Sequence, residues 1–267
     1  MKTTAILNLK GGVGKTVTAI NMAAILAGDH NRRVLVIDAD SQCNTTEFLS
    51  PARDGTPNTL ADLLLMPELA GSPGGYEDYI SASNVDGVDL LPASDELMDL
   101  DLSTLKSGVT SAGVLRSLLE ACIEDDVYDN VLIDCPPAFN AASAAALVAA
   151  DEVLIPVKLD AFSLQGMANL LRQVANLREI NPRLRVAGLL PTMWYMDPLI
   201  IQAEGTLREK SGLHVYGPIR RSDKVNAMTF AQEPLRIYSP RSAAGIDYRA
   251  FVREWLEDQR FGGGAKK

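Results

Sequence analysis

Two lysines bracket a glycine-rich run near the start of the chain, where residues 10–16 read Lys-Gly-Gly-Val-Gly-Lys-Thr. The apolar residues 5–9 before this run predict a buried strand, and residues 17–26 after it predict a helix. Glycines let backbone N–H groups approach an anion, and the start of a helix adds unpaired N–H groups and the positive end of its dipole. We therefore expect a phosphate-binding loop, in which Lys15 neutralises the β- and γ-phosphates and the Thr16 hydroxyl ligates Mg²⁺. The plainer alternative, a glycine-rich turn with two surface lysines, fits the order strand, loop, helix less well.

An acidic residue follows the next apolar run of the chain. The apolar residues 34–37 are followed by Asp38. This pattern is typical of a central parallel strand with an acid at its carboxyl end. Ligands of open α/β sheets bind at that edge. A helix cap or a turn remains the alternative for residues 38–41, because Asp and Ser favour both.

Three motifs resemble those of the ParA/MinD ATPases, and more specifically those of ParA/Soj-type chromosome and plasmid partitioning ATPases. Residues 10–16 resemble the deviant Walker A box of that family, and residues 38–42 resemble its D-x-D-x-Q motif. Residues 131–137, an apolar run followed by Asp-Cys-Pro-Pro, resemble its Walker B motif. The resemblance covers nearly the whole chain. It implies the cofactors ATP and Mg²⁺ and a homodimer in the ATP state.

The resemblance also implies roles for individual side chains. Lys10 would reach across the dimer interface to the nucleotide of the other subunit, and Asp40 would orient or activate the attacking water. Asp134 would hold Mg²⁺ through a water, and Asp38 would fix the loop or the metal's water shell. Arg220 stands where the family usually has a proline, in a segment whose backbone borders the adenine. The implied catalytic residues are Lys10, Lys15 and Asp40, the metal-site residues are Thr16, Asp38 and Asp134, and the nucleotide-binding residues are Lys10, Gly11, Gly12, Val13, Gly14, Lys15, Thr16, Val17, Asp134 and Arg220.

Charge is distributed unevenly along the chain, whose net charge is −9. Residues 1–160 hold 9 Lys/Arg and 24 Asp/Glu, a net of −15, whereas residues 161–267 hold 16 and 10, a net of +6. One face of the molecule could therefore meet an anion, while the alternative is that acidic residues merely solvate loops. The family resemblance favours non-specific DNA as that anion, with a solvated basic loop as the alternative. The candidate DNA contacts are Arg221, Lys224, Arg236 and Arg241.

Composition bounds the fold and the setting. The chain has 267 residues, 47% of them hydrophobic, which suffices for one substantial α/β core or two small ones. Alternating strands and helices predict an α/β P-loop fold with a mostly parallel central sheet and helices on both faces. We expect one domain over residues 1–260 and a flexible tail over residues 261–267. Three cysteines, two histidines and no apolar run of about 20 residues predict a cytoplasmic protein without disulfides, a zinc site or a membrane span.

These observations predict an ATPase that binds non-specific DNA as an ATP sandwich dimer and is released by slow hydrolysis. The expected partner is a ParB-like centromere-binding protein that accelerates hydrolysis, and the cargo would be a plasmid, mobile element or chromosome in the nucleoid. A positioning ATPase that recruits a protein partner without touching DNA is the first alternative. A metabolic ATPase related to dethiobiotin synthetase is the second, although no substrate-side motif supports it. The run Trp194-Tyr195-Met196 departs from the polar, basic loop of the family and is either a partner surface or core.

Overall fold

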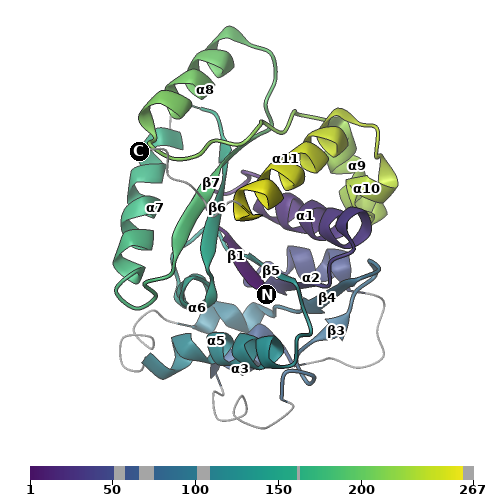
Figure 1. Ribbon diagram of the computed structural model, residues 1–267, viewed down its shortest axis with the longest axis vertical. Helices are drawn as coiled ribbons and strands as arrows, with labels where there is room; N and C mark the ends of the chain where they lie inside the picture. Colours follow the sequence, from purple (N-terminus) through teal and green to yellow (C-terminus); the bar gives the residue numbers. More distant parts are fainter. Residues whose placement is uncertain (51–57, 66–74, 101–108, 161–162, 261–267) are drawn as a thin grey trace.

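The computed structural model describes residues 1–50, 58–65, 75–100, 109–160 and 163–260 (Figure 1). A seven-stranded sheet with the order β3-β4-β2-β5-β1-β6-β7 runs through the middle of the molecule. Every neighbouring pair is parallel except β3 and β4, which are antiparallel. The predicted mostly parallel sheet is therefore confirmed. Its strands are β1 (Lys2–Ile6), β2 (Val34–Asp38), β3 (Ser81–Ala82), β4 (Val88–Leu91), β5 (Asn130–Asp134), β6 (Glu152–Lys158) and β7 (Arg185–Thr192).

Helices cover both faces of this sheet, as predicted (Figure 1). Side chains alternate between the faces of a strand, so Ile6 and Val36 pack into one core and Ala5 and Ile37 into the other. The first core is covered by α1 (Lys15–His30), α2 (Asn44–Leu49), α9 (Asp223–Ala231), α10 (Leu235–Tyr238) and α11 (Ala243–Arg260). The second is covered by α3 (Leu60–Leu65), η2 (Asp95–Asp99), α5 (Val109–Glu124), α6 (Ala141–Ala149), α7 (Ser163–Leu177) and α8 (Pro198–Lys210).

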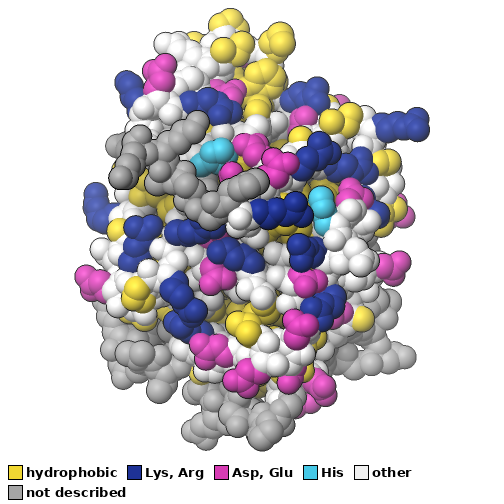
Figure 2. All heavy atoms as spheres, viewed as in Figure 1, with side chains coloured by type: hydrophobic (Ala, Val, Ile, Leu, Met, Phe, Trp, Pro, Cys, Tyr) yellow, Lys and Arg dark blue, Asp and Glu magenta, His cyan; other side chains and the backbone are white. Residues whose placement is uncertain are grey.

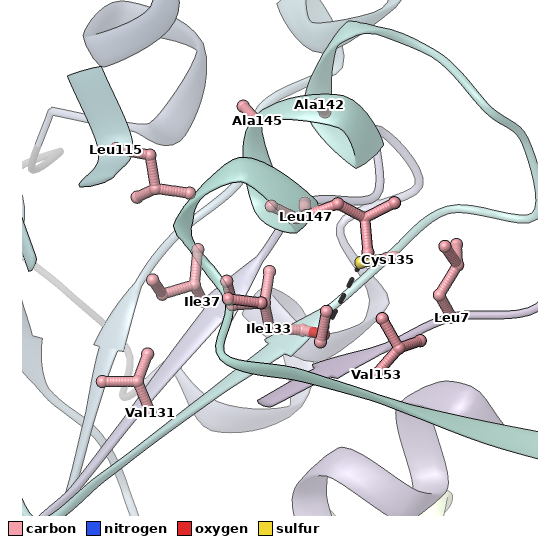
Figure 3. Close-up of a cluster of buried hydrophobic side chains, with 14 of the residues drawn as sticks. Leu7, Ile37, Leu115, Val131, Ile133, Cys135, Ala142, Ala145, Leu147 and Val153 are labelled. Atoms are coloured by element: carbon pink, nitrogen blue, oxygen red, sulfur yellow. Dashed lines mark hydrogen bonds between the residues drawn. The ribbon is translucent and has the colours of Figure 1, made fainter. Parts of the chain in front are cut away.

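Small side chains let α6 approach the strands closely. Ala142 and Ala145 lie above Ile133 and Val153, while Leu115 of α5 closes the same core (Figure 3). Cys135 is fully buried there and its Sγ donates to the carbonyl oxygen of Ile133 over 3.7 Å (Figure 3). Burial raises the pKa of this thiol well above its ordinary value. Cys135 is therefore a packing residue without a charged thiolate.

The segment 213–219 does not form a regular strand. It runs beside β7, where Val215 forms an isolated bridge with Leu189, and the next residue of the chain, Arg220, forms one with Trp194. Pro218 has no N–H group to donate, so a regular ladder cannot continue through this segment. Residues 95–99 form the short 3₁₀ helix η2, and the predicted tail lies outside the described residues. None of the described helices has the length and apolar content to span a membrane.

Candidate nucleotide site

The glycine loop joins the end of β1 to the start of α1. Gly12 and Gly14 have φ angles of 68° and 86°, in the left-handed region that favours glycine. A Cβ added at Gly11 or Gly12 would meet no other atom within 4 Å, so this side of the loop faces open space. The loop therefore leaves room for an anion against its backbone, as the sequence predicts.

Two polar side chains, one just after β1 and one at the end of β7, hold the loop in shape. Asn8 donates its amide to the carbonyl oxygen of Pro156 over 2.7 Å and accepts the N–H group of Lys10 over 3.0 Å. Thr192, at the end of β7, donates its hydroxyl to the carbonyl oxygen of Val13 over 2.8 Å. No local sequence pattern points to Asn8 or Thr192, because their bonds join segments that are distant in sequence.

Lys15 begins α1 and is only 7% exposed. Burial lowers the pKa of its ammonium group, while the negative charges of Asp134 and Asp40 act in the opposite direction. Taking a charge out of water is costly unless an opposite charge compensates. A polyanion bound in the loop would supply that compensation, so the site favours a phosphate group beside Lys15.

Asp134 lies at the centre of the buried polar groups. Its Oδ2 accepts the hydroxyl groups of Thr16 and Thr45, each over 2.7 Å. Its Oδ1 is buried and has no hydrogen-bond partner within the described residues. Burial raises the pKa of Asp134. A buried acceptor without a partner is costly, so Oδ1 marks the place where a water or a cation would be stabilised.

Asp38 and Asp40 organise the segment after β2. The Oδ1 atom of Asp38 accepts the N–H group of Asp40 over 3.1 Å, and its Oδ2 accepts the N–H and hydroxyl groups of Thr46, each over 2.8 Å. Asp40 in turn accepts the N–H group of Gln42 over 3.1 Å. Burial and the charge of Asp134 raise the pKa of Asp38. Both oxygens of Asp38 are thus used within the chain, and its role at the site stays a prediction.

These groups fit a magnesium ion that is shared with a phosphate. In the part of the chain that the structure describes, no group of three or more His, Cys, Asp or Glu side chains could hold a metal. Mg²⁺ is usually held by one or two carboxylates together with waters and substrate phosphates. The Thr16 hydroxyl and the unpartnered Oδ1 of Asp134 are oxygen donors of the kind required.

A cavity of about 430 Å³ opens beside the loop. Gly14 and Val17 line one side of it, and residues 219–223, 225 and 226 line another. The Tyr248 hydroxyl, on α11, lies 3.2 Å from the hydroxyl oxygen of Thr18 and forms part of the wall. The volume suits a small organic ligand such as a nucleoside. The cavity therefore continues the anion site into a space for a base and sugar.

Arg220 lines this cavity, but its guanidinium group has a partner within the chain. The guanidinium group donates to both carboxylate oxygens of Asp247, over 2.7 and 2.8 Å. The backbone N–H group of Arg220 donates to the same carboxylate over 2.9 Å. The side chain thus fixes the backbone of this segment against α11. Any contact from Arg220 to a base would come from that backbone, as the sequence analysis expects.

The ammonium group of Lys10 forms an ion pair with the carboxylate of Asp160, two residues beyond the end of β6. The two side chains are 37% and 31% exposed. Lys10 is therefore held against its own chain, and a contact with another subunit requires it to leave Asp160. No sequence motif points to Asp160 as the partner of Lys10.

The four candidate DNA contacts do not form one cluster. Arg221 and Lys224 are exposed, and Arg221 lines the nucleotide-sized cavity. Arg236 instead pairs with Asp29 near the end of α1, over 2.7 Å. Arg241 is exposed just before α11. The charge of Arg236 is therefore already balanced within the chain.

Comparison with known proteins gives consistent relatives. The family described as an AAA domain matches residues 1–186. The chain is 33% identical over 263 residues to the chromosome partitioning protein ParA of Caulobacter vibrioides, covering 97% of this chain and 96% of that protein. It is 35% identical over 254 residues to the chromosome-partitioning ATPase Soj of Thermus thermophilus, covering 94% and 93%.

Solved structures of similar proteins share the fold. Apo McdA of Cyanothece superposes with a TM-score of 0.81 and 26% identity, covering 96% of this chain and 99% of that one. Cobyrinic acid a,c-diamide synthase of Mycobacterium smegmatis, with a bound ATP analog and magnesium, gives a TM-score of 0.80 and 26% identity, covering 98% and 96%. These structures carry the same α/β P-loop architecture that the motifs predict.

Proposed function

Because this chain belongs to the ParA/Soj-type family of P-loop ATPases, we propose that it binds ATP with Mg²⁺, dimerises in that state and leaves it by hydrolysis. The observation that carries this proposal is the group formed by Lys15, Thr16 and Asp134. A buried ammonium, a hydroxyl and an unpartnered carboxylate oxygen converge next to a nucleotide-sized cavity. This set suits a magnesium-bound triphosphate.

Different residues of the site bind the phosphates, the nucleoside and the metal ion. Lys15 and the N–H groups of the glycine loop bind the phosphates, and the cavity that Tyr248 lines takes the nucleoside. Thr16 and Asp134 would hold Mg²⁺, directly and through water respectively. When bound, Mg²⁺ stabilises the negative charge of the phosphoryl group being transferred. Both ligands are supported by cobyrinic acid a,c-diamide synthase, a protein of the same fold that was crystallised with an ATP analog and magnesium.

Hydrolysis needs a water held in line with the γ-phosphate. We assign its placement to Asp40, because this carboxylate lies next to the buried pair Asp38 and Asp134 and is itself only 9% exposed. Asp38 keeps this segment in place through its bond to the Asp40 N–H group. We expect hydrolysis to be slow and a ParB-like partner to accelerate it.

Lys10 completes the site of a second subunit. Two triphosphates facing each other across an interface repel, and a lysine contributed from each side offsets that repulsion. The proposed dimer binds non-specific DNA, through phosphates, with exposed basic residues such as Arg221 and Lys224. Hydrolysis then dissolves the dimer and releases the DNA, which allows cargo DNA to be segregated in the cytoplasm of a dividing cell.

Light scattering on the Asp40→Ala variant tests the proposal. With saturating Mg²⁺ and ATP the variant should be a dimer, and without nucleotide it should be a monomer. The same variant carrying Lys10→Ala should bind ATP and stay monomeric. A monomer at saturating magnesium-nucleotide in the single variant would contradict the dimerisation switch, and dimers in the double variant would contradict the role of Lys10.

A second candidate function is that of a positioning ATPase that recruits a protein partner without DNA. One observation favours it: apolar side chains are exposed beside the cavity, among them Met196 at 83% and Leu199 at 73%. Exposed apolar clusters often mark protein interfaces. A gel-shift assay with random duplex DNA, with and without ATP, separates the two, because only the DNA-partition function requires an ATP-dependent shift.

A further inference from the structure

Basic side chains gather where α1 and α11 end, away from the nucleotide cavity. We call this group the basic edge and define it as His30, Arg32, Arg253 and Arg260. The 16-residue helix α1 begins at the glycine loop and ends at His30, so its two ends are about 24 Å apart. Lys and Arg side chains are visible over α1 and α11 in Figure 2. The basic edge therefore lies far from Arg221, which lines the cavity.

A buried carboxylate fixes the end of α11 at this edge. Glu152 begins β6 and is fully buried. Its Oε1 accepts the indole N–H of Trp255 over 2.9 Å and the side-chain amide of Gln259 over 3.3 Å, while its Oε2 pairs with Arg185 over 2.7 Å. Because Gln259 precedes Arg260, this bonding holds Arg260 at the amino-terminal edge of the sheet.

The members of the basic edge are close enough to act on one another. Partial burial lowers the pKa of His30, and the positive charges of the three arginines of the basic edge lower it further, against the opposing effect of Asp29. Asp29 itself pairs with Arg236 and Arg249, which balance its charge. Arg32 also faces Asp129 over 4.0 Å, so the positive charge of this edge rests mainly on Arg253 and Arg260.

Two of these arginines have no acidic partner. Arg253 and Arg260 are exposed, and no carboxylate oxygen of a described residue lies within 4.0 Å of either guanidinium group. They are seven residues apart on α11, so they share one face of the helix about 10 Å apart. Glu257 lies on the same face and opposes them. The pair is available to a ligand that carries regularly spaced negative charges.

We propose that the basic edge binds the phosphate backbone of duplex DNA, as a surface separate from Arg221 and Lys224. This inference rests on the proposed function for the nature of the anion. A lipid surface fits less well, because a helix that lies on a membrane needs apolar side chains on its outer face. On the described part of α11 the large apolar side chains Phe251, Val252 and Trp255 are buried, and only Ile246 is exposed.

The position of the basic edge also bears on the dimer. If two subunits pair through their nucleotide sites, each basic edge lies about one helix length away from that interface. Two separated DNA contacts in one dimer raise the overall affinity, because the second contact forms at a high effective concentration. The ATP dependence of DNA binding then follows from bivalency, without a change in either basic edge.

The test compares a double variant, Arg253→Gln with Arg260→Gln, with a matched control, Arg172→Gln with Arg183→Gln. The control removes the same charge from exposed arginines at α7 and just before β7. Binding of random duplex DNA is titrated against salt in the presence of Mg²⁺ and a non-hydrolysable ATP analog. The double variant should bind at least about tenfold more weakly, with a salt slope smaller by about 2. Glu257→Gln should bind DNA more tightly than the wild type.

The possible results of this test distinguish a failure of the basic edge from a failure of the proposed function. Equal affinity and salt slope in the double variant and its control would overturn the basic edge while leaving the partition function intact. No DNA binding by the wild type would instead contradict the DNA-binding part of the proposed function, and the basic edge with it. Loss of binding to phosphatidylserine vesicles, with DNA binding unchanged, would assign the edge to a membrane and also overturn the inference. ATP binding and the melting temperature of the double variant establish that it is folded.

Discussion

Lys10 and Asp160 form an ion pair within one chain, although Lys10 is the residue expected to contact the nucleotide of a second subunit. Both side chains are partly exposed, at 37% and 31%. Ion pairs of this kind contribute about 0–1 kcal/mol. The pair therefore opposes the transfer of Lys10 to a partner only weakly, and it favours the monomer by that amount in each subunit.

Removing the Asp160 carboxylate should shift the equilibrium between monomer and dimer toward the dimer. Asp160→Asn releases Lys10 in both subunits, so two pairs of up to about 1 kcal/mol each no longer oppose dimerisation. The dimer should dissociate up to about 30-fold less readily, as measured by sedimentation equilibrium with Mg²⁺ and a non-hydrolysable ATP analog. Glu179→Gln, which removes an exposed carboxylate two residues beyond α7, is the charge-matched control. A weaker dimer in Asp160→Asn would mean that Asp160 itself contacts the second subunit.

Lys15 should carry most of the charge neutralisation of the triphosphate. A hydrogen bond to a charged group contributes about 1.5–3 kcal/mol, so Lys15→Ala should weaken ATP binding by about 10- to 100-fold or more. Titration with a fluorescent ATP analog measures this. Lys224→Ala removes an exposed lysine of α9 and should leave the affinity unchanged. Wild-type affinity in Lys15→Ala would remove the central claim of the proposed function.

The glycine loop and the buried parallel strands can be predicted from the sequence because each depends on local patterns. Buried parallel strands read as apolar runs, and both Asp38 and Asp134 stand at the ends of such runs. Their pairing in register across β2 and β5 follows from that position. The positive φ angles of Gly12 and Gly14 likewise follow from a local requirement of the loop.

The rest of the site depends on contacts between distant segments, which no local pattern reports. Thr45 reaches Asp134 across 89 positions, and Thr192 reaches Val13 across 179. Arg236 carries no sequence sign that it pairs with Asp29. A basic residue can be assigned to DNA from composition alone, but its actual partner is set by which helices pack together.

Arg236 should therefore matter for stability more than for DNA binding. Its guanidinium group bonds to Asp29 and to the carbonyl oxygen of Gly28 near the end of α1, over 2.7 and 2.8 Å. A cation in this place also interacts favourably with the helix dipole, by about 0.3–1 kcal/mol. Arg236→Ala should lower the melting temperature by about 1–4 °C at pH 7, while Arg221→Ala should leave it unchanged.

The pH dependence of that loss checks the ion pair. Partial burial alone would raise the pKa of Asp29, but hydrogen bonds from Arg236 and Arg249 outweigh it and lower the pKa. A carboxyl with a lowered folded pKa stabilises the fold fully above its unfolded pKa, near 3.9, and loses this as the pH falls through the folded pKa. The difference between wild type and Arg236→Ala should shrink below about pH 4. A difference that stays constant down to pH 3 would assign the effect to packing on Gly28 instead.

Asp134 should destabilise the nucleotide-free protein, because its charge is buried for ligand binding. Burial raises its folded pKa to about 6, above its unfolded value. The folded state then binds more protons than the unfolded state between about pH 4 and pH 6, so stability falls as the pH rises through this window. Asp134→Asn removes this titration. The melting temperature of the variant relative to wild type should rise between about pH 4 and pH 6 and stay level above that, by the equivalent of about 1–3 kcal/mol.

The same substitution should reverse its effect when ligand is added. With Mg²⁺ and ATP the wild type should gain stability by mass action, whereas Asp134→Asn should gain little, because the neutral amide cannot support the cation. The amide nitrogen also lacks an acceptor at the position of Oδ1, which adds a cost that does not depend on pH. For that reason the slope against pH, rather than the melting temperature at one pH, is the diagnostic quantity. An unchanged slope together with full stabilisation by magnesium-ATP would place the metal away from Asp134.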